Sequence, residues 1–241
     1  MSNHSARLVE HLAALKPTLL DGAIGASATM ALLDTLGCGL YGANQQWGRI
    51  LRAQILHEGS RGMATLFGEN VTVAPSRAAL ANGTASHGFE LDDIIQGALV
   101  HPGAVVIPAA LAVAEQSGAS GERLLLGIVA GYEVIARLGW ALGAEHNTRG
   151  YHTTGVAGPI AATVAAGIVL GLSMEIILSA IGIACSSAGG ASRPSRKARA
   201  AWSSACTRDE RQRRVYWRVN WRSAASLARW RAWTAALACW K

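Results

Sequence analysis

The fold is decided by residues 104–142, which read AVVIPAALAVAEQSGASGERLLLGIVAGYEVIARLGWAL, and by residues 154–170, which read TGVAGPIAATVAAGIVL. Ser-Gly-Ala-Ser-Gly and a loop over residues 143–150 divide this sequence into three apolar runs. Each run is longer than a typical strand, the runs together are rich in alanine, and glycines inside the second and third permit close contact between helices. We therefore expect three long helices, at 104–116, 122–142 and 154–170, packed against one another.

The flanking sequence extends this helical pattern in both directions. Apolar residues recur at helical spacing before residue 60, and a Ser-Met-Glu N-cap pattern follows Gly171. Alternation around a central Gly-Glu-Asn predicts one small hairpin, and Ser76 is expected to cap a short helix after it. The sequence predicts an all-α helical bundle with one small β-hairpin. Its expected elements are helices over 5–15, 18–40, 47–57 and 173–187, the hairpin over 63–75 and the helix after Ser76.

The net charge of +7 divides at Ala191 into two unlike segments. Residues 1–190 carry 9 Lys and Arg against 13 Asp and Glu, whereas residues 191–241 carry 13 against 2. The second segment has no glycine and holds 6 of the 8 tryptophans. We therefore expect one helical domain over 5–190, followed by a tail over 191–241 that does not belong to the fold.

Several bulk features bear on the compartment. The N-terminal residues lack the apolar core and cleavage site of a secretory signal, and the four cysteines have no zinc-type spacing, so we expect reduced thiols in a cytoplasmic protein. Residues 152–174 carry no charge and are long enough to span a bilayer. The run is rich in Ala, Gly and Thr and has no aromatic belt, so we favour a helix buried between other helices and expect no membrane partner.

The densest group of titratable residues lies at 87–103, which reads HGFELDDIIQGALVHPG. It presents Glu90, Asp92, Asp93 and His101 at a helix end and in the loop that follows. Neighbouring carboxylates raise one another's pKa and histidine titrates near neutrality, so this group can supply a general acid and a general base. The alternative is a solvated acidic helix end with a capping histidine.

A second group, at 147–155, reads NTRGYHTTG and places His152 at the start of a helix. Hydroxyls and free backbone amides there suit an anionic ligand, although an ordinary N-cap reads the same way. No nucleotide-binding, metalloprotease or serine-hydrolase motif is present. Asp92 and Asp93 could bind a metal, but the sequence does not specify a complete ligand set.

Taken together, four stretches resemble the MmgE/PrpD family. They are ANGTASHGFELDD, HPGAVVIPAALAVAE, RGYHTTGVAGPIAATVAAGIVLGLS and AIGIACSSAGG, which occur in this order within residues 5–190. That family includes 2-methylcitrate dehydratases, cis-aconitate decarboxylases and an iminodisuccinate epimerase. The resemblance implies a metal-free and cofactor-free lyase or isomerase acting on small di- or tricarboxylates. It also implies a homodimer in which each subunit has a helical domain and a separate α/β lid.

The resemblance carries over onto particular residues. The family's acidic stretch falls on Glu90 to Asp93, its His-Pro motif on His101-Pro102, and a third motif on Gly150 to Thr153. It implies that His101 and His152 carry protons or stabilise an oxyanion, and that the carboxylates orient them. Substrate-binding residues are expected at Tyr151 and Thr153. Glu replaces the family's Asp at position 90, and Ile94 replaces a common Thr, which argues against copying the cis-aconitate decarboxylase activity directly.

The tail departs from the family. Where the family continues with a Gly-Met-Val-Lys-Arg-Met-His-like stretch whose lysine contributes to the substrate site, this chain reads ASRPSRKARAAWSSACTRDERQRRVYW. A back-translation of Ala191–Tyr216 with GC-rich codons, read one base out of phase, can yield GIKAFTQGTGGMVKRMHAGRAAEAGV. The hypothesis is a frameshift near Ala191 that places the lysine codon across Ser203 and Ser204. We then expect a truncated chain with little or no activity.

Two alternatives take the tail at face value. Its arginines and tryptophans could bind nucleic acid through phosphate contacts and stacking on a helical scaffold. It could instead lie on a membrane surface, although it lacks a clean amphipathic period. Because basic aromatic patches normally sit on a recognisable module, we expect a small carboxylate substrate and no nucleic-acid partner.

Overall fold

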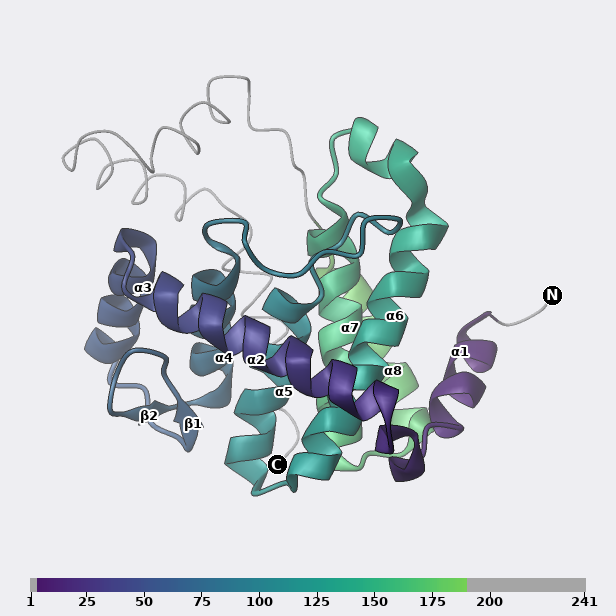
Figure 1. Ribbon diagram of the computed structural model, residues 1–241, viewed down its shortest axis with the longest axis horizontal. Coiled ribbons are helices and arrows are strands. Elements are labelled where there is room, and N and C mark those ends of the chain that lie inside the picture. The colour runs from purple at the N-terminus through teal and green to yellow at the C-terminus, as the bar shows by residue number, and fades with distance from the viewer. Residues whose placement is uncertain (1–3, 190–241) are drawn as a thin grey trace.

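The computed structural model describes residues 4–189 as a bundle of helices with one short hairpin (Figure 1). The predicted all-α class is confirmed. The predicted tail over 191–241 lies outside the described residues. The helices are α1 (His4–Ala13), α2 (Ala23–Ala43), α3 (Gln46–His57), α4 (Pro75–His87), α5 (Gly103–Ser117), α6 (Gly121–Thr148), α7 (Thr153–Leu170) and α8 (Met174–Ser187), with a 3-10 turn at Pro17–Leu20.

The main core lies where α5, α6, α7 and α8 meet. α7 packs most extensively against α6, and it also contacts α5 and α8. Small residues let these helices approach closely: a Cβ on Gly131 would meet the side chains of Val106 and Ala165, on α5 and α7. The side chains of Ile107, Ile128, Ile135, Val164 and Ile177 are buried there.

By length and composition alone, three helices are apolar enough to cross a membrane, namely α2, α6 and α7. Of the three, α7 has the largest buried share and sits between other helices, which is the environment we predicted for residues 152–174. The absence of a membrane partner stays a prediction.

A second layer is formed by α2, α3, α4 and the hairpin. In Figure 1, α2 crosses the front of the bundle diagonally, and α4 packs between α2 and α5. The hairpin pairs β1 (Ala64–Thr65) antiparallel with β2 (Thr72–Val73), as predicted. Asn82 of α4 ties it down, because its side chain accepts from Phe67 N at 2.9 Å and donates to Thr65 O at 2.8 Å.

Three predicted boundaries are wrong. The helix expected over 18–40 is a 3-10 turn followed by α2. Gly22 lies between them with φ 85°, which is not a helical backbone angle. Ser76 does not cap α4, since Ala74 is the N-cap and Ser76 lies in the first turn after Pro75. α6 continues to Thr148 through the loop expected at 143–150, with a kink at Gly143, where φ is 68°.

Candidate functional site

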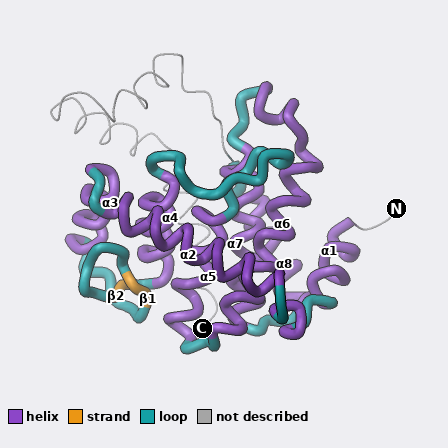
Figure 2. The backbone as a smooth tube through the Cα atoms, in the orientation of Figure 1, coloured by secondary structure: helices purple, strands orange, loops and turns teal. Residues whose placement is uncertain are grey.

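The site is built around the long connection between α4 and α5, residues 88–102, which appears as a teal loop over the helices in Figure 2. An isolated bridge between Ile95 and Val100 closes its middle. Its end is tied to α7, because the backbone N of His101 donates to the hydroxyl of Thr154 at 2.9 Å. The loop therefore brings the end of α4, the start of α5 and the start of α7 to one place.

Asp93 fixes the same loop to α5 and α6. Its Oδ1 accepts from the backbone N of Gly103 at 2.8 Å, and its Oδ2 accepts from the hydroxyl of Tyr132 at 2.7 Å. Burial, with the charge of Asp93, raises the pKa of Tyr132 far above its ordinary value, so this hydroxyl keeps its proton. Both oxygens of Asp93 are thus engaged in holding the loop.

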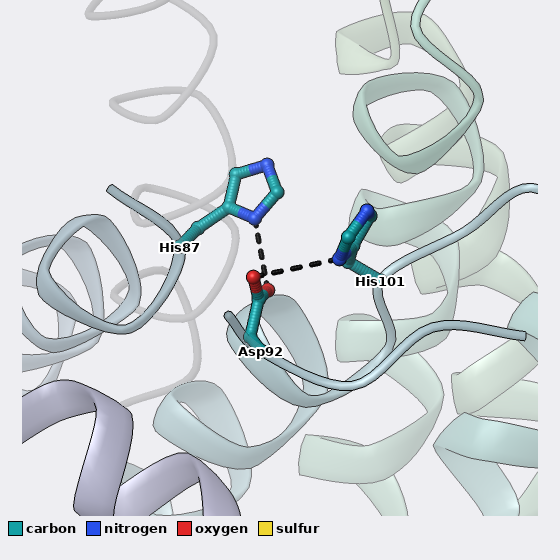
Figure 3. Close-up of side chains that lie close together, drawn as sticks. All are labelled: His87, Asp92 and His101. Atoms are coloured by element: carbon teal, nitrogen blue, oxygen red, sulfur yellow. Dashed lines mark hydrogen bonds and ion pairs between the residues drawn. The ribbon is translucent and has the colours of Figure 1, made fainter. Parts of the chain in front are cut away.

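Asp92 lies between two histidines (Figure 3). Its side chain is fully buried, with 0% exposure. Nδ1 of His87, the last residue of α4, donates to Oδ2 of Asp92 at 2.8 Å. Nδ1 of His101 lies 3.4 Å from Oδ1 of Asp92, and neither of these two atoms has a hydrogen-bond partner. The carboxylate is therefore held tightly by His87 and loosely by His101.

Glu90 lies near the imidazole rings of His87 and His101, on the edges that face away from Asp92. Its carboxylate oxygens are 3.9 Å from Nε2 of His87 and 4.0 Å from Nε2 of His101, and its side chain is 58% exposed. Glu90 adopts φ 60°, which costs a residue other than glycine about 1 kcal/mol. Each imidazole thus has a buried carboxylate on its Nδ1 edge and an accessible carboxylate near its Nε2 edge.

His152 completes the cluster from α7, where it is the N-cap. Its ring stacks on His87, with centroids 5.9 Å apart and an interplanar angle of 25°. The rings of His87 and His101 meet edge to face at 4.9 Å. The structure thus brings Glu90, Asp92, His101 and His152 together, from segments as much as 62 positions apart.

The surroundings shift the pKa values of these groups in opposite directions. Although burial opposes ionisation, the contacts with His101 and His87 lower the pKa of Asp92 to about 2. The carboxylate of Asp92, 3.4 Å from Nδ1 of His101, raises the pKa of His101 against the effect of burial. Burial, helped by the neighbouring His87, lowers the pKa of His152. One carboxylate stays ionised, one histidine favours the protonated form, and the other favours the neutral form.

The two predicted substrate-binding residues differ in exposure. Tyr151 is 47% exposed, and its ring stacks on His146 with centroids 5.0 Å apart. Thr153 is fully buried at the first position of α7, and its hydroxyl oxygen has no hydrogen-bond partner. Their contact with substrate stays a prediction.

Within residues 4–189, one group of three side chains brings possible metal-ligand atoms close together: His87, Asp92 and His101, within 4.8 Å of one another. The 2.8 Å between His87 Nδ1 and Asp92 Oδ2 is a hydrogen-bond distance. Zinc bonds of 2.0–2.1 Å in a tetrahedron would separate the ligand atoms by about 3.3 Å. The pair is therefore spaced for a shared proton.

Three residues of the site were not predicted as site residues. His87 belongs to the stretch singled out above, but sequence does not show that a helix-terminal side chain turns back toward Asp92. Tyr132 lies in the middle of α6 and Thr154 in the first turn of α7, and both act through the loop. Thr154 belongs to the stretch 147–155 singled out above, whereas nothing in the sequence around Tyr132 distinguishes it from the other polar residues of α6.

Comparison with known proteins shows which family the chain resembles. The family model of the MmgE/PrpD N-terminal domain matches residues 6–208, and so extends past Ala191. The cis-aconitate decarboxylase-like protein oryM of Aspergillus oryzae is 35% identical over 196 residues, covering 78% of this chain and 41% of the relative. The cis-aconitate decarboxylase of Aspergillus terreus is 30% identical over 170 residues, covering 68% of this chain and 34% of the relative.

A human cis-aconitate decarboxylase is 34% identical over 177 residues, covering 71% of this chain and 36% of the relative. The chain thus spans between 34% and 41% of the length of these relatives.

Proposed function

The chain belongs to the MmgE/PrpD family, and on that premise we propose that its site performs acid–base lyase chemistry on a small di- or tricarboxylate. The family and its cis-aconitate decarboxylase relatives support a lyase-type function. The observation that carries the proposal for this chain is the geometry of the cluster: the buried carboxylate of Asp92 lies against Nδ1 of both His87 and His101, and His152 stacks on His87. The pKa values of His101 and His152 are shifted in opposite directions, which supports it.

Opposite shifts in neighbouring groups assign an acid and a base. His101, whose pKa is raised by Asp92, is the proton donor. His152, whose pKa is lowered by burial, is the neutral base or the hydrogen-bond donor to a developing oxyanion. Asp92 holds the imidazole of His101 from its Nδ1 side, so Nε2 is the nitrogen that faces the accessible side of the cluster.

Among the reactions of the family, we propose a decarboxylation because the relatives are named for it, and we assign the departures at Glu90 and Ile94 to the choice of substrate. The carbon–carbon bond to one carboxylate breaks, carbon dioxide leaves, and the electron pair passes into the conjugated system of the substrate. A substrate carbon then takes the proton from Nε2 of His101. The remaining carboxylates need cationic or hydrogen-bonding partners, which protonated His101 and the first turn of α7 with Thr153 supply.

Glu90 sets one limit on substrate choice. The carboxylate of Glu90, near Nε2 of both His87 and His101, repels an anionic substrate unless the side chain of Glu90 moves away. We therefore propose that Glu90 and Tyr151, on the exposed side of the histidine cluster, affect which carboxylate substrate binds.

The 51-residue tail enters the proposal separately. We propose that the sequence after Ala191 results from a frameshift and that the family lysine is absent, so that this chain has little activity by itself. The abrupt change in charge and glycine content at Ala191 supports this. Resequencing the gene tests it: an intact reading through these codons, with no family sequence in another frame downstream, contradicts the frameshift.

Activity is tested on two purified proteins. The first is the 241-residue chain, and the second keeps residues 1–190 and continues in the alternative frame after that point. Each is incubated with cis-aconitate and with 2-methylcitrate while the substrate is followed by proton NMR. We expect turnover in the second protein, reduced at least about 100-fold by His101→Gln and by His152→Gln. His57→Gln, at an exposed histidine on α3, is the matched control. Unchanged turnover in the His101 and His152 variants contradicts the assigned roles.

The family implies a homodimer, which we propose for the intact enzyme. Sedimentation of the two proteins side by side tests it, and a monomer at micromolar concentration of the alternative-frame protein contradicts it.

A further inference from the structure

Asp92 is shared unequally between its two histidine neighbours. The contact with His87 is a hydrogen bond of 2.8 Å, whereas the contact with His101 is 3.4 Å long and lacks hydrogen-bond geometry (Figure 3). The side chain is completely buried, so no bulk water competes for its oxygens. The distance to His101 therefore depends on how Asp92 is held by the protein.

We propose that His87 is a positioning residue: its hydrogen bond to Asp92 keeps this carboxylate from pairing fully with His101 and so leaves the proton of His101 free to move. The inference rests on the proposed function, because it is the proposed proton transfer that gives the loose contact its purpose. It adds a residue to which that function assigns no role.

The position of His87 suits it to fix a carboxylate. As the last residue of α4, it is held by a helix packed between α2 and α5. Its ring meets that of His101 edge to face and stacks on that of His152, and these two contacts restrict its rotation. Asp92, by contrast, is in a loop whose neighbouring residue Asp93 anchors the backbone. The helix therefore sets the direction in which the Asp92 carboxylate points.

The consequence concerns the balance between acid and base. A carboxylate in full hydrogen-bonded contact stabilises the imidazolium and slows the release of its proton. A carboxylate held slightly away still orients the ring and favours protonation, but less strongly. An efficient general acid has a pKa near the working pH, and the shared Asp92 keeps His101 closer to that condition.

Other charged groups also face this pair. Glu90 lies near Nε2 of both rings, Asp93 adds negative charge near His101, and His152 lies beside His87. A test must therefore separate the hydrogen bond of His87 from the other effects of its ring. Two substitutions do this. His87→Asn and His87→Leu both remove the ring, but only Asn retains a donor nitrogen close to the place of Nδ1.

The measurement is a pH titration of the His101 imidazole by NMR in the full 241-residue chain with labelled histidine. In His87→Leu we expect the carboxylate of Asp92 to move closer to His101. The pKa of His101 should then rise by about 0.5 to 1. In His87→Asn we expect the pKa to stay near that of the parent chain. Equal pKa values of His101 in the parent and the Leu variant, or equal rises in both variants, overturn the proposal.

The parent chain gives a second result that needs no variant. The Nδ1 proton of His87 is expected to resonate downfield and to exchange slowly, whereas that of His101 exchanges faster. The reverse order overturns the proposal. Because neither measurement uses a substrate, absence of lyase activity would contradict the proposed function while leaving this result intact. In the active protein, His87→Leu shifts the acid-group limb of the pH–rate profile in the same direction, and His87→Asn restores it.

Discussion

Asp92 is ionised although its side chain is fully buried, and this shapes the stability of the site. Burying an isolated carboxylate is costly, so the charge depends on its two histidine partners. Its folded-state pKa of about 2 lies below the unfolded value near 3.9. Its ionisation therefore stabilises the fold above about pH 4, and that stabilisation is lost as the pH falls toward 2.

Asp92→Asn removes this charge, and we expect its cost to depend on pH. The pKa difference corresponds to about 2 kcal/mol above pH 4. Toward pH 2 the parent and the variant should converge. The raised pKa of His101 adds a limb of opposite sign, because its protonation stabilises the fold below its unfolded pKa near 6.5, and this is lost as the pH rises through the folded value.

Urea unfolding at several pH values from 2 to 9 measures the difference. The pKa shifts of Asp92 and His101 report the same interaction, so their energies are not added. The largest destabilisation is expected between about pH 4 and pH 6.5, where Asp92 is ionised and His101 is protonated in the folded parent chain. A difference that stays constant from pH 2 to pH 9 contradicts the ionised pairing of Asp92.

Tyr132 gives a second residue-scale prediction. Tyr132→Phe removes the hydroxyl that donates to Asp93 and leaves a buried carboxylate oxygen with one partner fewer. We expect the free energy of unfolding to fall by about 1–3 kcal/mol. Tyr151→Phe is the matched control, since Tyr151 is exposed and should change stability by less than about 0.5 kcal/mol. Equal small effects of both substitutions would show that the loop is not held by Tyr132.

At the scale of elements, the contact between α2 and α4 depends on one glycine. A Cβ placed on Gly42 would overlap the backbone carbonyl of Ala85 on α4, which no side-chain motion can relieve. Gly37, on the same helix, has no atom within 4 Å of the place where its Cβ would be, and it is exposed. The two positions therefore separate helix propensity from helix packing.

Gly42→Ala is expected to destabilise the chain by about 1–3 kcal/mol, because the helices must move apart. Gly37→Ala is expected to stabilise it by about 0.5–1 kcal/mol, because alanine restricts the unfolded chain and favours the helix. Thermal unfolding of both variants beside the parent measures this. A gain in stability from Gly42→Ala would show that α2 and α4 do not cross at this place.

Most of the helices could be predicted because their apolar runs are long and periodic. The apolar residues of these runs form the buried core of the bundle. The boundaries that failed depend on backbone angles that composition does not reveal. Gly22 and Gly143 both adopt positive φ, but Gly22 separates the 3-10 turn from the start of α2, whereas Gly143 only kinks α6. The difference is set by the packing around them.

For the whole molecule, the chemistry of the site could be predicted further than its geometry. The stretch 87–103 and the start of α7 were identified by their titratable residues, and the fold brings them together. The division of labour between Asp92 and Asp93 could not be predicted, because adjacent carboxylates look equivalent in sequence. Only the approach of Tyr132 and Gly103 shows that Asp93 holds the loop while Asp92 faces the histidines.

An apolar stripe lies exposed on α2. It is formed by Met30, Leu33, Leu40 and Tyr41, each more than half exposed in the described part of the chain. Their spacing of three, seven and one places them along one side of the helix. Contiguous exposed apolar surface is unusual for a soluble monomer and favours association. The double substitution Met30→Gln, Leu33→Gln should therefore reduce self-association without weakening the fold.

We expect the unfolding midpoint of this variant to stay within about 2 °C of the parent, since exposed substitutions change stability by about 0.5 kcal/mol or less. Light scattering over a concentration series should fall relative to the parent chain. Asp34→Asn, at an exposed position of α2 outside the apolar set, is the matched control and should leave scattering unchanged. A large drop in the midpoint would mean that the folded chain covers Met30 and Leu33, because only buried apolar side chains stabilise the fold to that extent.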